Sequence, residues 1–212
     1  DNGRLKLSPV GTWSSRFAEG ARATVFTNSG SYRGTILPLM ASGHTFNDKV
    51  DKQPVSWDNI EFRVDQWSRG KEDLKKLGLS VGDFVAVDSQ PEILDSGFIN
   101  ARFLDDKAGV SCVLTALKAI KENSLPVPLP TYPLFTISEE VGSGASSILQ
   151  GSISEMLSVD IAIVGPGQES SEGLLSIVQM DSSGPFDYHL NKKLERICRE
   201  GGLKYCRDIF DY

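Results

Sequence analysis

Residues 1–94 alternate between apolar and polar positions with the period of a β-strand. Every second residue from 60 to 64 is apolar and the residues between them are charged, which is typical of a strand with one buried face. Two further runs rich in β-formers, 21–27 and 31–37, lie on either side of Asn-Ser-Gly and predict a hairpin. The apolar run 84–87 predicts another strand.

One short helix is expected in the same part of the chain. Ser68 can cap a helix that runs to Leu77, and Gly78 directly after it is typical of a helix end. Several short strands with one small helix favour a compact barrel or sandwich. We therefore expect a β-rich domain over residues 1–94.

From about residue 95 the pattern changes to strands that alternate with helices. Residues 107–121 carry apolar side chains at i, i+3, i+4 and i+7, which predicts an amphipathic helix. A helix is also expected to begin near Ala145. The other predicted elements are strands at 134–137, 160–164 and 175–180, and a helix at 187–199 whose inner face holds Leu190, Leu194, Ile197 and Cys198. This alternation indicates a layered α/β domain over residues 95–212.

Composition narrows the function classes. With 40% hydrophobic and 24% charged residues, the chain is not of the disordered class. Its 22 basic and 28 acidic side chains give a net charge of −6, which argues against a nucleic-acid partner. No apolar stretch approaches the ~20 residues of a membrane-spanning helix. Three cysteines without a CxxC motif fit a reducing cytoplasm rather than a disulfide framework.

Two acidic pairs follow predicted strands. Asp105-Asp106 comes before the 107–121 helix, and Glu139-Glu140 comes directly after the 134–137 run. Chemistry in α/β sheets gathers where strands end, and paired carboxylates are costly to bury unless a cation compensates them. Taken alone, each pair is more often a helix cap or a solvated first turn. Together they favour a metal site in which one carboxylate serves as a general base.

Other chemistry-bearing residues are weaker candidates. His44 and His189 are the only histidines, and neither lies near the acidic pairs in sequence, so an all-protein zinc site is incomplete. There is no G-x-S-x-G elbow, and the glycine-rich run 142–147 lacks the lysine of a P-loop. Cys112 lies within the predicted helix and is expected to pack rather than react.

Two segments in succession resemble a known family. Residues 101–110, Ala-Arg-Phe-Leu-Asp-Asp-Lys-Ala-Gly-Val, and 135–142, Phe-Thr-Ile-Ser-Glu-Glu-Val-Gly, are similar to the glutamyl/deblocking aminopeptidases, the tetrahedral (TET-type) di-metal enzymes. The stretch 77–83 also resembles the segment that precedes their catalytic residues. The resemblance implies a three-layer α/β/α metallopeptidase-like catalytic domain, of which 95–212 would be a part, and a small PDZ-like β-barrel domain for dimerisation over 1–94.

The same resemblance implies roles for individual residues. Asp105 would bridge two metal ions, Glu139 would be the general base that activates water, Glu140 would be a terminal metal ligand, and Asp106 would support the helix start. The cofactors would be two divalent ions, zinc or cobalt. The partners would be peptides and further copies of the chain, in a dimer-based homo-oligomer of up to twelve subunits, with no nucleic acid and no membrane, in the cytoplasm.

Departures from the family pattern leave alternatives open. The family's upstream His-x-Asp and its last histidine ligand are absent from the 212 residues, so we expect a truncated fragment that is inactive and binds metal weakly. The family's further aspartate ligand is expected where Gly165 stands, with Gln168 or Glu169 as substitutes. Gly165 motivates a second hypothesis, an altered homologue that binds or hydrolyses a small amidated, peptide-like metabolite. A third hypothesis is a structural assembly module driven by residues 1–94.

Overall fold

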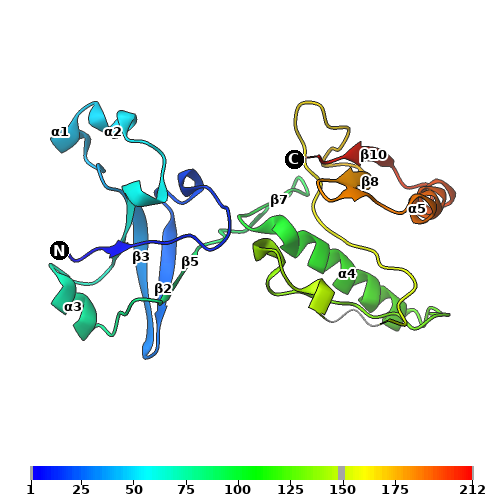
Figure 1. Ribbon diagram of the computed structural model, residues 1–212, viewed down its shortest axis with the longest axis horizontal. Helices are drawn as coiled ribbons and strands as arrows, with labels where there is room; N and C mark the ends of the chain where they lie inside the picture. The colour runs from blue at the N-terminus through cyan, green and yellow to red at the C-terminus, as the bar shows by residue number, and fades with distance from the viewer. Residues whose placement is uncertain (1, 148–150, 212) are drawn as a thin grey trace. The chain divides into compact units, whose positions relative to one another are not determined.

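The structure, a computed structural model, describes residues 2–147 and 151–211 and divides into two compact units (Figure 1). The first unit comprises Asp1–Phe103 and Leu134–Ser154, and the second comprises Leu104–Pro133 and Glu155–Tyr212. The positions of the two units relative to one another are not determined. Each unit is therefore described by itself.

The first unit is built on a five-stranded antiparallel sheet with the order β1-β4-β3-β2-β5. The predicted hairpin and the predicted strands near 60–64 and 84–87 are confirmed. The strands are β1 Leu5–Lys6, β2 Arg22–Thr27, β3 Gly30–Pro38, β4 Ile60–Val64 and β5 Phe84–Val87. A separate two-stranded ribbon is formed by β6 Glu92–Ile93 and β7 Ile99–Asn100.

One face of the five-stranded sheet holds the core of the first unit. Its largest fully buried side chains come from three neighbouring strands, at the alternating positions that the sequence predicts; they are Val25, Ile36, Ile60, Phe62 and Val64. Gly34 lies in β3 where a Cβ atom would collide with the Phe62 ring. The missing side chain at Gly34 therefore lets the aromatic ring lie across the sheet.

Short helices connect these strands. They are η1 Ser15–Phe17, α1 Gly43–Phe46, α2 Lys49–Lys52, η2 Trp57–Asn59 and α3 Lys71–Lys76. The helix predicted from Ser68 forms, but it begins later, with Gly70 as its N-cap. Ser68 is used differently, because its hydroxyl donates to the carbonyl of Gly3 at 2.9 Å. Gly78, with φ +81°, follows the helix end as expected.

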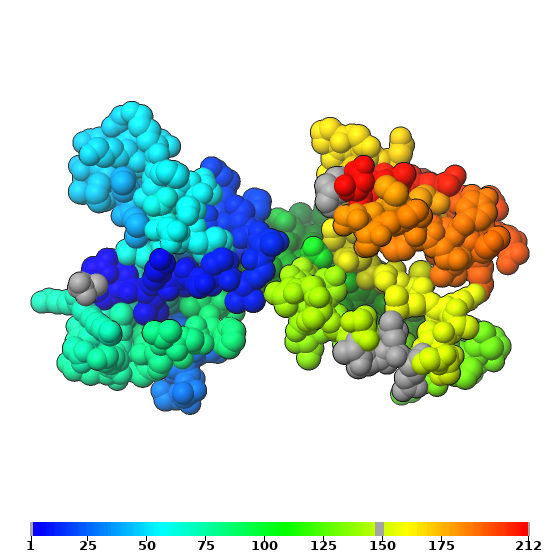
Figure 2. All heavy atoms as spheres, viewed as in Figure 1, coloured from blue at the N-terminus to red at the C-terminus, as the bar shows by residue number. Residues whose placement is uncertain are grey.

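The second unit is an α/β unit. It contains α4 Leu104–Glu122, β8 Leu175–Asp181, β9 Gly184–Pro185, α5 Tyr188–Glu200 and β10 Tyr205–Ile209. β8 pairs in parallel with β10 and antiparallel with β9. The helix α5 connects the two parallel strands and contacts β8; in Figure 2 the atoms of β8, α5 and β10, orange to red, lie against one another. The predictions for 175–180, 187–199 and 107–121 are confirmed.

Two predicted strands do not form. Residues 134–137 and 160–164 run without ladder partners, and Ile137 is 99% exposed. A short apolar run signals burial without saying what covers it, so it becomes a strand only where a partner strand is present. The 134–137 run leads instead into the short helix η3 Glu139–Val141, followed by η4 Ala145–Ser147. The helix expected from Ala145 falls partly on 148–150, outside the described residues.

The helices of the second unit bury less apolar surface than their patterns predict. Leu114 of α4 is 52% exposed, and Ile197 of α5, expected to face inward, is 49% exposed. Glu195 is buried in α5 instead, because Lys192 and Arg207 contact its carboxylate at 2.9 and 3.3 Å. Among the described residues, none of the helices combines the length and apolarity needed to cross a bilayer.

Candidate metal centre

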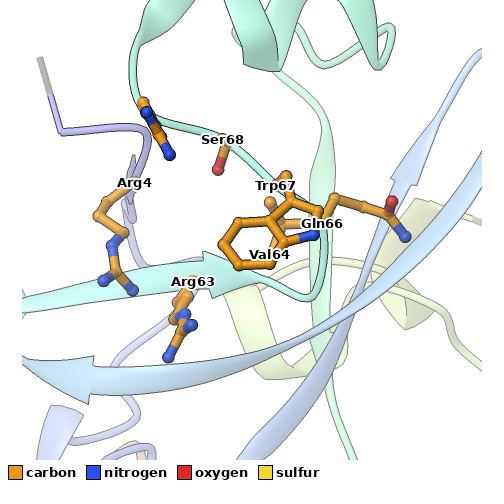
Figure 3. A pocket seen from close by; sticks show the side chains of 7 residues that line it. Arg4, Arg63, Val64, Gln66, Trp67 and Ser68 are labelled. Carbon is orange, nitrogen blue, oxygen red and sulfur yellow. The ribbon is translucent and has the colours of Figure 1, made fainter.

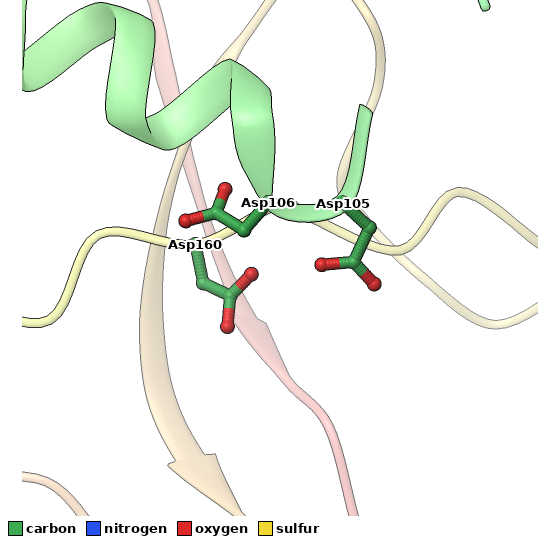
Figure 4. Close-up of side chains that lie close together, drawn as sticks. All are labelled: Asp105, Asp106 and Asp160. Atoms are coloured by element: carbon green, nitrogen blue, oxygen red, sulfur yellow. The ribbon is translucent and has the colours of Figure 1, made fainter. Parts of the chain in front are cut away.

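Three aspartates of the second unit form a cluster. Asp105 and Asp106 lie at the start of α4, and Asp160 comes from the extended segment after residue 155 (Figure 4). Each offers a carboxylate oxygen, and these oxygens all lie within 4.8 Å of one another. The sequence prediction of an acidic site at the start of this helix therefore has a third member from a distant segment.

Asp106 is held in place by the first turn of α4. Asp105 and Asp106 have non-helical dihedral angles (φ −78°, ψ 115° and φ −109°, ψ 44°), so the regular helix begins after them. The Asp106 carboxylate accepts a hydrogen bond from the amide of Gly109 at 3.0 Å, the contact of an N-cap residue with the third residue of its helix. A Cβ atom at Gly109 would collide with both carboxylate oxygens.

The charge balance of the cluster favours a cation. Burial raises the pKa of Asp106, the Gly109 amide opposes this rise, and the negative charge of Asp160 adds to it. Asp105 and Asp160 are exposed, which leaves their carboxylates accessible. Carboxylate oxygens are ligands for hard divalent ions and also for zinc. The residues of the cluster thus fit a divalent cation, which would offset the repulsion between Asp106 and Asp160 that adds to the effect of burial.

The other predicted site residues lie in the first unit. Glu139 and Glu140 begin η3 and are exposed, and η3 ends at Gly142, whose amide donates to the Glu139 carbonyl at 2.7 Å. Gly11 of the same unit lies beside the backbone of Glu140. Because the units are not placed relative to one another, the convergence of Glu139 and Glu140 with Asp105 stays a prediction.

Comparison with protein families decides the classification. The model of the M42 glutamyl aminopeptidases matches residues 1–212. The chain belongs to the M42 glutamyl aminopeptidase family. The family resemblance seen in the segments around Asp105 and Glu139 is thereby confirmed over the whole chain.

Two curated relatives are similar along most of the chain. The putative aminopeptidase YhfE of Bacillus subtilis is 36% identical over 212 residues, which are 100% of this chain and 61% of the relative. The putative aminopeptidase FrvX of Escherichia coli is 24% identical over 200 residues, which are 92% of this chain and 54% of the relative. The chain thus spans less than two thirds of the length of either relative.

Solved structures share the fold. A TET aminopeptidase from a marine-sediment Thaumarchaeota archaeon superposes with a TM-score of 0.81 at 21% identity, over 98% of this chain and 60% of that one. The TET1 peptidase of Pyrococcus horikoshii, which can assemble into a tetrahedron or a large octahedral shell, gives a TM-score of 0.79 at 22% identity. The match covers 99% of this chain and 63% of that peptidase. The chain therefore has the α/β fold of these structures.

Asp160 is the site residue that sequence reasoning missed. An M42 aspartate ligand was expected at the carboxyl end of the apolar run 161–164, where Gly165 stands. The structure instead brings the aspartate at the other end of the run beside Asp105 and Asp106. A polar residue next to an apolar run was the available signal, but only the tertiary contact shows which end of the run approaches α4.

Asp208 holds Gln168 and the backbone of Glu169, the two residues suggested as substitutes for a ligand at Gly165, whereas the Glu169 side chain is exposed. The buried Asp208 of β10 accepts hydrogen bonds from the Glu169 amide at 3.0 Å, the Ser170 amide at 2.8 Å and the Ser170 hydroxyl at 2.7 Å. With its amide nitrogen turned toward the same carboxylate, Gln168 donates to it at 2.9 Å. The loop after Asp160 is therefore fastened to the sheet of the second unit by Asp208.

The weaker candidates stay outside the cluster. His44 lies exposed in α1, and His189 lies exposed in the first turn of α5. The His189 ring is next to the Tyr188 ring, with 5.6 Å between the ring centroids. Cys112 of α4 is an exposed free thiol, so the packing role expected for it is wrong. Cys198 is buried and Cys206 half-buried, and both are also free.

Proposed function

We propose that the full-length protein is a metal-dependent aminopeptidase, a hydrolase that removes N-terminal residues from peptides. The observation that carries this proposal is the cluster of three carboxylates at the start of α4, in a chain matched along its whole length by the M42 glutamyl aminopeptidase model. The altered homologue is less well supported, because Asp160 supplies an acidic group to the cluster although residue 165 is glycine.

Four acidic residues would hold and use the metal. We assign Asp105, Asp160 and Glu140 as metal ligands, with Asp106 supporting the helix start through Gly109. Two divalent ions, zinc or cobalt, would polarise the scissile carbonyl and lower the pKa of water when bound. Glu139, next to the ligand Glu140, would take the proton from the attacking water as general base.

Replacing Glu139 by glutamine tests the role of this carboxylate. Glutamine has nearly the same shape but cannot accept a proton, so Glu139→Gln in the full-length protein should lower kcat for peptide hydrolysis by roughly 10²–10⁴-fold with the metal content unchanged. The control is Glu92→Gln, an exposed residue of the β6–β7 ribbon, which should keep full activity. Unchanged hydrolysis in Glu139→Gln would refute the assignment.

Replacing Asp160 by asparagine tests the metal assignment. Asp160→Asn removes a charge from the three-aspartate cluster and should weaken divalent-metal binding by about tenfold or more, because a catalytic site usually has only three protein ligands. Elemental analysis after equilibrium dialysis measures this loss. The matched variant Asp95→Asn, in an exposed turn, should retain its metal. Equal metal content in both variants would exclude Asp160 as a ligand.

The remaining features of the proposal concern architecture. We infer that the five-stranded unit is the PDZ-like accessory domain, and that the second unit is part of a three-layer α/β/α catalytic domain. We further propose a dimer-based homo-oligomer of up to twelve subunits, in the cytoplasm. Support comes from the similar TET structures, one of which was solved as a dodecamer, and from three thiols that form no disulfide with one another.

A further inference from the structure

Two arginines lie opposite each other at the edge of the five-stranded sheet. The antiparallel register of β1 and β4 pairs Leu5 with Phe62 and Lys6 with Glu61, so the next position in this direction sets Arg4 against Arg63. Because Phe62 is buried on the core face, Arg63 points to the opposite, polar face. Like charges directly opposite on neighbouring strands are unfavourable.

Two other arginines on the same polar face are neutralised by aspartates. Arg22 is paired with Asp65, with one Nη1–Oδ1 contact of 3.2 Å, and Arg33 is paired with Asp88, with one contact of 2.6 Å. Among residues 2–147 and 151–211, by contrast, Arg63 has no carboxylate within 4 Å. The contact between Arg4 and Glu61, from the Arg4 Nε to a Glu61 carboxylate oxygen, is 3.8 Å long, which is too long for a hydrogen bond.

Arg4 also carries an unsatisfied donor. Its Nη1 is buried and has no hydrogen-bond partner among the residues that the structure describes. A buried donor without a partner costs the full desolvation penalty of the group, and more when the group is charged. Within the described residues, the Arg4 guanidinium therefore lacks a carboxylate at hydrogen-bond distance.

These side chains line one cavity (Figure 3). Its volume is about 130 Å³, and its lining includes Arg4, Arg63 and Arg69 together with Gln66, Trp67 and Ser68. Like Arg63, Arg69 has no carboxylate partner within 4 Å in the described part of the chain. Trp67 is 94% exposed, and its ring borders the two opposed arginines in Figure 3. The cavity thus combines three positive charges with a flat apolar surface.

We propose that this cavity binds an oxyanion, a carboxylate or a phosphate group of a small molecule. The planar fork of a guanidinium matches both groups with two parallel hydrogen bonds. An oxyanion between Arg4 and Arg63 would relieve their repulsion. Since the chain as a whole has a charge of −6, this local positive site does not follow from net charge.

The test is calorimetric titration of the full-length protein with three probes: inorganic phosphate, N-acetylphenylalanine, and the uncharged amide of N-acetylphenylalanine. Binding of phosphate but not of N-acetylphenylalanine identifies a phosphate site. Binding of N-acetylphenylalanine, with no binding of its uncharged amide, identifies a carboxylate site. Arg63→Gln and Arg4→Gln should each weaken binding by about tenfold or more, the effect of losing a charged hydrogen bond. Arg16→Gln is the matched control, because Arg16 is exposed and lies outside the cavity lining.

Further variants keep the test decisive. Arg63→Lys preserves the charge but not the fork, and it should recover part of the affinity lost in Arg63→Gln. Trp67→Ala should weaken N-acetylphenylalanine more than phosphate, because only the former has a ring to stack. Absence of binding by both charged probes, or binding that persists in Arg4→Gln and Arg63→Gln, overturns the proposal.

Discussion

Gly109 controls the position of the Asp106 carboxylate. The carboxylate occupies the space that a Cβ atom would need and accepts the Gly109 amide hydrogen bond at 3.0 Å. Gly109→Ala should push Asp106 out of the cap and weaken metal binding by the cluster. It should also lower stability by about 1 kcal/mol, the usual effect of losing an N-cap. Chemical denaturation and metal titration of the full-length protein measure the two effects.

Gly43 is the matched control for Gly109. It lies in the helix α1, and a Cβ atom added there would meet no other atom within 4 Å. Because alanine is favoured over glycine in helices by up to about 1 kcal/mol, Gly43→Ala should leave stability unchanged or raise it. If Gly109→Ala behaved like Gly43→Ala, the carboxylate would not depend on this glycine.

Among the elements, β10 ties the loop after Asp160 to the sheet. The hydrogen bond from the Ser170 hydroxyl lowers the pKa of Asp208 below its ordinary value of 3.8. Desolvation opposes this lowering, and hydrogen bonds from backbone amides add to it. A carboxyl whose pKa is lowered by folding stabilises the native state above its unfolded pKa. This contribution is therefore complete above about pH 4 and is lost as the pH falls through the lower, folded value.

The Asp208 contribution predicts a pH signature. Asp208→Asn should lower the melting temperature at neutral pH, and the difference from the unmodified protein should shrink as the pH falls below 3.8. Thermal melts across this range measure it. Asp211→Asn, an exposed aspartate two residues beyond β10, is the control and should follow the unmodified protein. A difference that does not change with pH would mean that the carboxylate charge is irrelevant.

At the scale of the whole molecule, the two units bury apolar residues to different extents. The first has a cluster of nine buried apolar residues, whereas in the described part of the second the buried apolar residues are Ile177 and Cys198. Large exposed apolar patches mark surfaces that another part or partner covers. The curated relatives are longer than this chain, which spans 61% of one of them and 54% of the other.

An isolated chain of these 212 residues should therefore behave differently from the full-length protein. We expect it to bind a hydrophobic dye, to associate in solution, to hold divalent metal weakly and to lack peptidase activity, because its apolar faces are exposed and the histidine ligands that the family resemblance implies are not among the 212 residues. Dye fluorescence, light scattering and metal analysis of both proteins check this. Tight, stoichiometric metal in the isolated chain would contradict the expectation that further histidine ligands are needed.

Sequence alone predicted the elements whose partners are close along the chain. The hairpin of β2 and β3 follows from two β-type runs around a turn, and α5 follows from the period of its apolar residues. The structure adds the cap of α5, in which the Leu190 amide donates to the Asp187 carboxylate at 2.7 Å. Sequence alone also predicted the position of Asp105 and the family, because both depend on short contiguous motifs. Local spacing was sufficient for each of these predictions.

Only the tertiary structure decided which distant segments meet. The apolar run 134–137 has no strand partner, Asp160 reaches Asp105 and Asp106 from more than fifty residues away, and Arg4 faces Arg63 through the register of β1 and β4. Such contacts depend on how whole elements pair, and the energy of that pairing is not contained in the periodicity of either segment.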